Sequence, residues 1–200
     1  MKFHLTILII ILNIFSLSIN AQEINPKLAY KTWLEKETRE INGYMVTKVF
    51  GVLPHTPSAY NYMPLTAVAY INPDQLKEEL IAKSKEEGWE QAELDKKLAE
   101  LKTNSKGGAI EVYISRYDEN NANFRWFFLI IRGENDDEKL WEHEIGYQAP
   151  QNPYERGWWN YTTVYVPVEV EVPFYIYLND KHRGYLSDFK FLIEKPIVKN

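Results

Sequence analysis

The stretch GWWNYTTVYVPVEVEVPFYIYL, residues 157–178, decides the fold class. Aromatic and β-branched side chains dominate it, and such side chains suit a pleated, half-buried sheet. Residues 168–172 alternate strictly between valine and glutamate, which is the two-residue period of a surface with one dry and one wet face. Pro167 and Pro173 lack the amide hydrogen that a sheet ladder needs, so we expect them at strand ends. The stretch therefore predicts two interior strands, covered on both faces and joined by an arch.

Short apolar or alternating segments, separated by polar turns, predict further strands along the chain. The predicted strands cover residues 44–53, 65–71, 109–117, 124–131, 140–147, 158–166, 174–178 and 188–194. Segments of this length and spacing favour a mainly β fold, a two-layer antiparallel β-sandwich of jelly-roll or Ig-like type. On the strand at 109–117 the alternation predicts that Glu111, Tyr113 and Ser115 face outward.

One region interrupts the strands with helical patterns. Asn72, Pro73 and Gln75 form a helix-start signal, because Asn72 can cap the helix, proline fits its first position and Gln75 can reach back to the cap. Gly88 ends this helix, and a second one follows with leucines at helical spacing. We therefore expect a helical hairpin, around 73–103, inserted between two strands. Its expected role is to cover a face or edge of the sandwich and to bury its own leucine face; the alternative is a docking element.

Residues 1–21 have the pattern of a secretory signal peptide. Lys2 gives a positive start, residues 5–17 form an apolar run with few interruptions, and Ala21 is a small residue at the cleavage site. The run is shorter than the ~20 residues that cross a bilayer, which favours cleavage over a membrane anchor. We expect residues 22–200 to form a single domain, exported to the periplasm, the envelope or the extracellular space.

The composition excludes several kinds of site and partner. The chain has no cysteine, which removes disulfides, thiol catalysis and thiolate metal sites. Its formal net charge is −5, and loss of residues 1–21, which hold Lys2 and no acid, makes it −6. Since there is also no basic run, we expect no binding to nucleic acid or to anionic membrane surfaces. We also expect no transmembrane segment after signal cleavage.

Aromatic side chains are the main binding candidates. Their flat apolar rings can stack on a sugar ring or contact a protein partner, and the candidates for ligand binding are Trp158, Trp159, Tyr161 and Trp141. The alternative is a place in the core, since one aromatic side chain buries roughly 150–250 Å². Adjacent strand residues point to opposite faces, so the outward member of the pair Trp158 and Trp159 is the preferred contact residue.

Two acidic turns are weak candidates for calcium binding. The first contains Asp118, and the second contains Asp136 and Asp137. Carboxylate oxygens are ligands that calcium prefers, but neither turn has the spacing of a known calcium loop. Asp and Asn also dominate ordinary turns, because they hydrogen-bond their own backbone. We therefore expect no cofactor apart from this weak calcium candidate.

The sequence contains no recognisable catalytic motif. Patterns of metalloproteases, serine hydrolases, P-loop proteins and dinucleotide-binding proteins are missing, so no catalytic residue is assigned. A glycoside hydrolase acting through two carboxylates stays open, because the separation of a carboxylate pair is not visible in a sequence. Its candidate carboxylates are Glu111, Glu142, Glu169 and Glu171.

Three functions remain. The first is an exported or envelope-associated, non-catalytic β-sandwich protein that binds a glycan or a protein partner through exposed aromatics. The second is a structural subunit of an envelope assembly, with the helical hairpin or an open strand edge as its joint. The third is the carboxylate-dependent glycoside hydrolase. The sequence does not decide the oligomeric state or the ligand.

Overall fold

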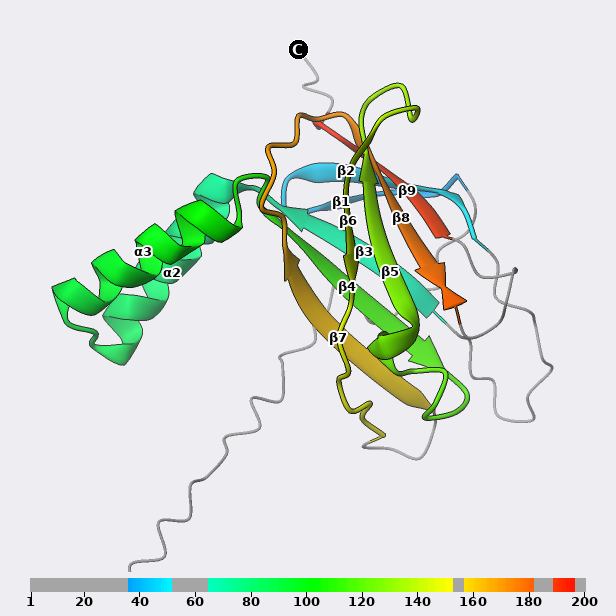
Figure 1. The fold of residues 1–200 in the computed structure, drawn as a ribbon, viewed down its shortest axis with the longest axis horizontal. Coiled ribbons are helices and arrows are strands. Elements are labelled where there is room, and N and C mark those ends of the chain that lie inside the picture. The colour runs from blue at the N-terminus through cyan, green and yellow to red at the C-terminus, as the bar shows by residue number, and fades with distance from the viewer. Residues whose placement is uncertain (1–35, 52–64, 153–156, 182–188, 197–200) are drawn as a thin grey trace, which may run out of the picture.

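Two antiparallel β-sheets packed against each other form the body of the protein (Figure 1). The computed structural model describes residues 36–51, 65–152, 157–181 and 189–196. One sheet has six strands in the order β1-β2-β9-β8-β5-β6, and the other has three in the order β3-β4-β7. The predicted mainly β, two-layer antiparallel sandwich is confirmed, whereas its jelly-roll or Ig-like character stays a prediction.

The observed strands match the predicted ones to within a few residues at most ends. The larger sheet consists of β1 (Thr38–Ile41), β2 (Tyr44–Phe50), β9 (Phe189–Glu194), β8 (Phe174–Asp180), β5 (Phe127–Arg132) and β6 (Lys139–Glu144). The smaller sheet consists of β3 (Leu65–Ile71), β4 (Ala109–Arg116) and β7 (Trp158–Tyr165). A 3-10 turn at Phe124–Trp126 precedes β5, and β1 was not predicted. The expected signal peptide, residues 1–21, lies outside the described residues.

One hydrophobic core joins the two sheets. The Tyr70 ring of β3 meets the Phe174 ring of β8 edge to face, with centroids 5.0 Å apart. The Arg116 side chain, from β4, also lies in this core and is 2% exposed. Its guanidinium group donates hydrogen bonds to the carbonyl oxygen of Leu65 at 2.7 Å and to the hydroxyl of Thr66 at 2.9 Å. These bonds offset the cost of taking a charged group out of water.

The stretch at 157–178 forms two strands and an arch, as predicted, but the strands belong to different sheets. β7 ends at Tyr165 in the small sheet, and β8 begins at Phe174 in the large one. In the arch, residues 166–173, the alternating valines are half-buried against the core while Glu169 and Glu171 are exposed. β8 is an interior strand, as expected. The expectation is wrong for β7, which pairs with β4 on one side and forms an edge of its sheet.

The outward side of β4 is buried, although its sequence alternates. Glu111, Tyr113 and Ser115 lie on the face turned away from the six-stranded sheet, as predicted, yet they are only 6–9% exposed. All residues of β3 and β4 are buried. Alternation indicates which face a side chain takes, but it does not indicate whether that face is covered.

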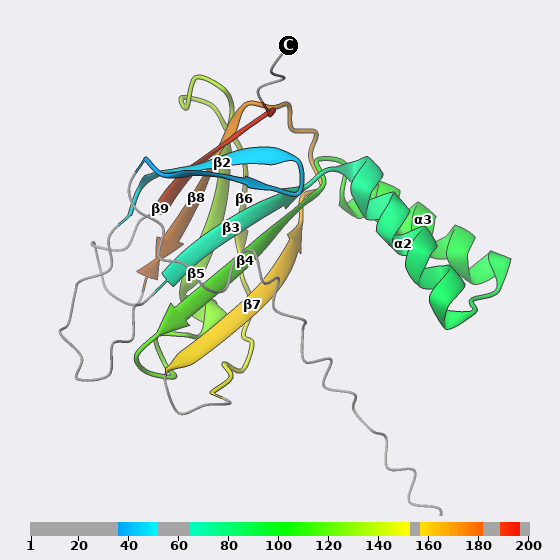
Figure 2. The same cartoon turned by 180° about the vertical axis from the view of Figure 1, so that it is seen from behind.

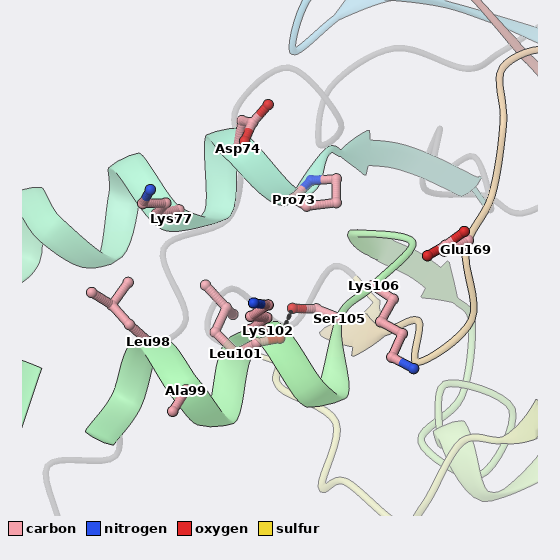
Figure 3. Close-up of a pocket in the computed structure, with 10 residues that line it drawn as sticks. All are labelled: Pro73, Asp74, Lys77, Leu98, Ala99, Leu101, Lys102, Ser105, Lys106 and Glu169. Carbon is pink, nitrogen blue, oxygen red and sulfur yellow. Dashed lines mark hydrogen bonds between the residues drawn. The ribbon is translucent and has the colours of Figure 1, made fainter. Parts of the chain in front are cut away.

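The predicted helical hairpin joins β3 to β4 and consists of α2 (Pro73–Glu87) and α3 (Gln91–Asn104). Figures 1 and 2 show it projecting from one end of the small sheet and covering neither sheet face. The expectation that it covers the sandwich is therefore wrong. Leu98 and Leu101 point from α3 toward α2 (Figure 3), while Leu76 packs against Ile71 and Ala109 at the end of the small sheet. In the described part of the chain neither helix is long and apolar enough to cross a membrane.

Candidate functional site

The start of the hairpin is tied to the turn between β1 and β2. Asn72 accepts a hydrogen bond from the backbone nitrogen of Gln75 at 2.9 Å, and the Gln75 side chain accepts one from the backbone nitrogen of Asn72 at 3.0 Å. This is the predicted capping box. The Gln75 amide also donates to the carbonyl oxygen of Asn42 at 2.8 Å, and the Asn72 amide donates to the Tyr44 hydroxyl at 2.9 Å. The residues that start α2 therefore also set its direction relative to the sandwich.

The end of the hairpin is tied to the arch. The backbone nitrogen of Gly107 donates a hydrogen bond to the carbonyl oxygen of Val166 at 2.9 Å. The backbone nitrogen of Val166 donates one to the carbonyl oxygen of Gly108, also at 2.9 Å. A Cβ atom on Gly107 would overlap the carbonyl oxygen of Val168, and one on Gly108, with φ of 86°, would overlap that of Ile71. Both glycines are needed for this close approach of two backbones.

Beyond these two anchors the hairpin is open to solvent. In α2, Leu76 and Ser84 are buried, whereas no residue of α3 is buried. The remaining leucines and isoleucines of the two helices are half-buried: Leu80, Ile81, Leu94, Leu98 and Leu101. Helices of this length are marginally stable in water without tertiary packing. The half-buried leucines and isoleucines leave part of their apolar surface exposed to solvent.

The tip of the hairpin carries a tryptophan held in place. Gly88 ends α2 in the left-handed conformation with φ of 68°, and Trp89 follows in the turn. The Trp89 indole nitrogen donates to the Glu87 carboxylate at 2.8 Å, and the Lys97 ammonium lies 4.6 Å from the centroid of its ring. The half-buried indole is thus ordered before any partner arrives.

Two clefts run along the seam between α2 and α3. The first, at the base of the hairpin, encloses about 610 Å³ and is drawn in Figure 3. Leu98 and Leu101 point from α3 toward α2 in this cleft, and Glu169 approaches from the arch. The second encloses about 440 Å³, and Leu101 lines it too, together with Tyr165, which is 49% exposed at the end of β7. The hairpin therefore offers a partly apolar groove on each side of Leu101.

The predicted aromatic candidates do not all face solvent. Trp158 and Trp159 take opposite faces of β7, as predicted, and both are half-buried. Trp159 is the outward one, and its ring stacks on that of Tyr113 with centroids 6.2 Å apart. Trp141 belongs to β6 in the other sheet, where it stacks on His143 at 5.3 Å.

Tyr161 is a buried side chain, 6% exposed, and not a surface one. Its hydroxyl donates a hydrogen bond to the carboxylate of Glu111. Burial, together with this hydrogen bond and the negative charge of Glu111, raises the pKa of Tyr161 above its ordinary range. The pair lies on the outward face of the small sheet, where Glu111 is 9% exposed.

The four carboxylates considered for hydrolysis lie on three separate segments. Besides Glu111 on β4, Glu142 is on β6, and Glu169 and Glu171 are in the arch. These last three are exposed. Glu79 of α2 has a raised pKa, because the side chain is partly buried and the negative charge of Glu111 adds to this effect.

The acidic turns make contacts within the protein. Asp118 accepts hydrogen bonds from the backbone and side-chain nitrogens of Asn121, which closes its turn. Asp137 is exposed, and its carbonyl oxygen lies 3.4 Å from the Arg132 guanidinium nitrogen. Within residues 36–51, 65–152, 157–181 and 189–196, no group of three or more His, Cys, Asp or Glu side chains could hold a metal ion.

Asp136 ties its turn to the outer face of the large sheet. Its carboxylate accepts hydrogen bonds from the Tyr177 hydroxyl, at 2.8 Å, and from the Lys190 ammonium. Burial raises the pKa of Asp136, but these hydrogen bonds and the charges of Lys190 and Arg132 outweigh it, and the net effect is a lowered pKa. The turn therefore folds back across β8 to reach β9.

The sequence matches no protein-family model, and neither a curated protein nor a solved structure matches it.

The base cleft was not found by sequence reasoning. Lys77, Lys102 and Lys106 line it together with the leucines, but α2 and α3 bring these lysines together only in the folded chain. No helical spacing could have shown this, because α3 ends at Asn104 and Lys106 lies in the turn that follows.

Proposed function

We propose that the chain is an exported, non-catalytic β-sandwich protein that joins a protein partner in the cell envelope through its helical hairpin. The observation that carries this proposal is a hairpin anchored at both ends and open along its length. Its α3 helix buries no residue within the described chain. Export and an envelope location rest on the signal-peptide pattern of residues 1–21.

Anchoring and exposure together favour binding over a purely structural role within the chain. Because Asn72, Gln75 and Gly107 hold the base, the hairpin presents its two clefts in one orientation. A rigid surface loses little conformational freedom when a partner binds. The Trp89 ring at the tip adds an ordered aromatic group, and aromatic residues are enriched among those that dominate interface energy.

Site-specific photo-crosslinking in the cells that produce the protein tests this proposal. A benzophenone amino acid replaces Gln91, which is exposed near the hairpin tip, and in a control protein it replaces Glu142, which is exposed on β6. We expect one discrete envelope protein to be linked at position 91 and not at position 142. Absence of that product, or equal products from both positions, would contradict the proposal.

A second candidate function is glycan binding at the β7 edge of the small sheet, where Trp159 is half-buried while the outward side chains of β4 are buried. It is supported by the Trp159 ring, which is half-buried and lies parallel to the Tyr113 ring within 22°. If a sugar stacks there, Trp159→Ala lowers binding on a glycan array at least about tenfold, a loss of about 1.4 kcal/mol. Trp158→Ala, on the opposite face, has a smaller effect. Equal losses, or no bound glycan, would exclude this function.

A further inference from the structure

The two clefts of the hairpin differ in how their lysines are used. Along the second cleft, Lys83 pairs with Glu87 at 3.7 Å and Lys97 pairs with Glu93 at 3.7 Å. In the base cleft the lysines are Lys77, Lys102 and Lys106, and none of them forms an ion pair with any described residue.

Two acids also line the base cleft, and neither forms an ion pair with its three lysines. Asp74 lies in the first turn of α2, where the partial positive charge of the helix N-terminus favours a carboxylate. Glu169 stands on the arch, at the end of the cleft that meets the sandwich. Among the described residues these lysines have no ion-pair partner, and three lysines against two acids leave an excess of positive charge beside Leu98, Leu101 and Ala99.

The shape of the cleft suits a helix. Its walls are the first turn of α2, with Pro73 and Lys77, and the last two turns of α3, so a partner helix entering there would contact both helices. Such a helix would cover Leu98 and Leu101, which α2 leaves half-exposed, and would complete a three-helix unit. The anchors at Asn72 and Gly107 fix the base of the hairpin relative to the sandwich.

We propose that the base cleft receives an acidic amphipathic helix of the partner protein. Its apolar side chains cover Leu98 and Leu101, and its carboxylates pair with Lys77, Lys102 and Lys106. This inference rests on the proposed function, and it adds the place and the chemistry of the contact. Unpaired ammonium groups beside an apolar floor attract a segment that carries both features, which is the helix-in-groove mode of recognition.

Crosslinking from within the cleft tests the occupant. The benzophenone amino acid replaces Ala99, which is exposed and lines the base cleft, in the full-length protein in its own cells. We expect mass spectrometry to find one segment of one protein, with apolar residues at helical spacing and an excess of Asp and Glu. A lipid, a segment of this chain, a basic segment or no product at position 99 would overturn the proposal.

Charge reversal tests the chemistry of the contact, with a matched control. The double variant Lys77→Glu/Lys102→Glu changes one cleft lysine on each helix. The control Lys85→Glu/Lys96→Glu also changes one lysine on each helix, outside both clefts, and each pair includes one lysine in the last turn of a helix. We expect the first to lower crosslinking from position 99 at least tenfold and the second to change it less than twofold. Equal effects would overturn the proposal.

The same experiment separates this inference from the function on which it rests. If position 91 captures the partner while position 99 does not, or if charge reversal has no effect, the hairpin docks a partner by another surface and only the inference fails. If both positions give no product, both proposals fail. Lysine substitutions at the linked acidic residues of the partner should restore crosslinking to the Lys77→Glu/Lys102→Glu variant at least fivefold, and a failure to restore it counts against direct charge pairing.

Discussion

The sandwich and the hairpin differ in where their apolar side chains go. In the sandwich, five phenylalanines are less than 2% exposed, and the faces of two sheets close over them. In the hairpin, only Leu76 and Ser84 are buried. The comparison teaches that the free energy of folding comes mainly from the sandwich. The position of the hairpin depends on a few hydrogen bonds, two glycines and the packing of Leu76 on Ile71 and Ala109 at its base.

The largest difference should appear when one apolar side chain is shortened in each region. Phe174→Ala removes a fully buried ring that meets Tyr70, and it should lower the free energy of unfolding by about 3–5 kcal/mol. Leu98→Ala removes a side chain already partly in water, and it should cost less than about 2 kcal/mol. Urea unfolding measures both. Equal costs would mean that the hairpin shares the core's role in stability.

A smaller effect is expected at the joint between the two regions. Gly107→Ala places a methyl group on the carbonyl oxygen of Val168, and such overpacking costs about 1–3 kcal/mol. The control Gly133→Ala meets no atom within 4 Å and should change stability by less than about 0.5 kcal/mol. Thermal unfolding compares the two, and hydrogen exchange shows whether the hairpin amides lose protection in the Gly107 variant. If both variants behave alike, the joint is not a close contact.

The smallest effect concerns the outer face of the large sheet and depends on pH. The pKa of Asp136 is lowered from its ordinary value of 3.8, so its contribution to stability is present above that value and is lost as the pH falls below it. Burial lowers the pKa of Lys190, but the hydrogen bonds and charges of Asp136 and Tyr177 outweigh burial and raise it above 10.5. Its contribution is therefore present below pH 10.5 and is lost as the pH rises beyond it.

The variant Asp136→Asn separates this contribution from the other carboxylates. It should abolish the acid-side step, the loss of stability that Asp136 causes as the pH falls below 3.8. It should change the stability at neutral pH by less than about 1 kcal/mol, since the ion pair is partly open to solvent. The exposed Asp137 provides the control, Asp137→Asn, which should leave the step in place. Chemical unfolding at a series of pH values measures both, and an unchanged acid-side step in Asp136→Asn would rule the contribution out.

Local sequence signals predicted the structure correctly wherever the stabilising contacts join residues that are close together in the sequence. The capping box of Asn72 and Gln75, the end of α2 at Gly88 and the arch between two strands were predicted from residues no more than a few positions apart. The opposite faces of Trp158 and Trp159 follow from strand geometry alone. For the candidate site, these signals located the hairpin but not its cleft, because Lys77 and Lys102 line the cleft from two different helices.

The wrong expectations all concern which distant segment covers, or pairs with, a helix or strand. Strand β7 was expected in the interior of a sheet but forms an edge. The hairpin was expected to cover a sheet but projects from it. A periodic pattern shows that a segment has two different faces, and it holds no information on which distant segment will cover either of them.

By itself, the sequence determined the class of the fold, all of the strands except β1, and the two helices, the first with its cap, because these follow from side-chain periodicity and hydrogen bonds between near neighbours. Only the tertiary structure decided the order of the strands, the burial of the outward side of β4 and the direction of the hairpin. These properties depend on contacts between residues far apart in the chain, such as Asn42 with Gln75 and Gly107 with Val166.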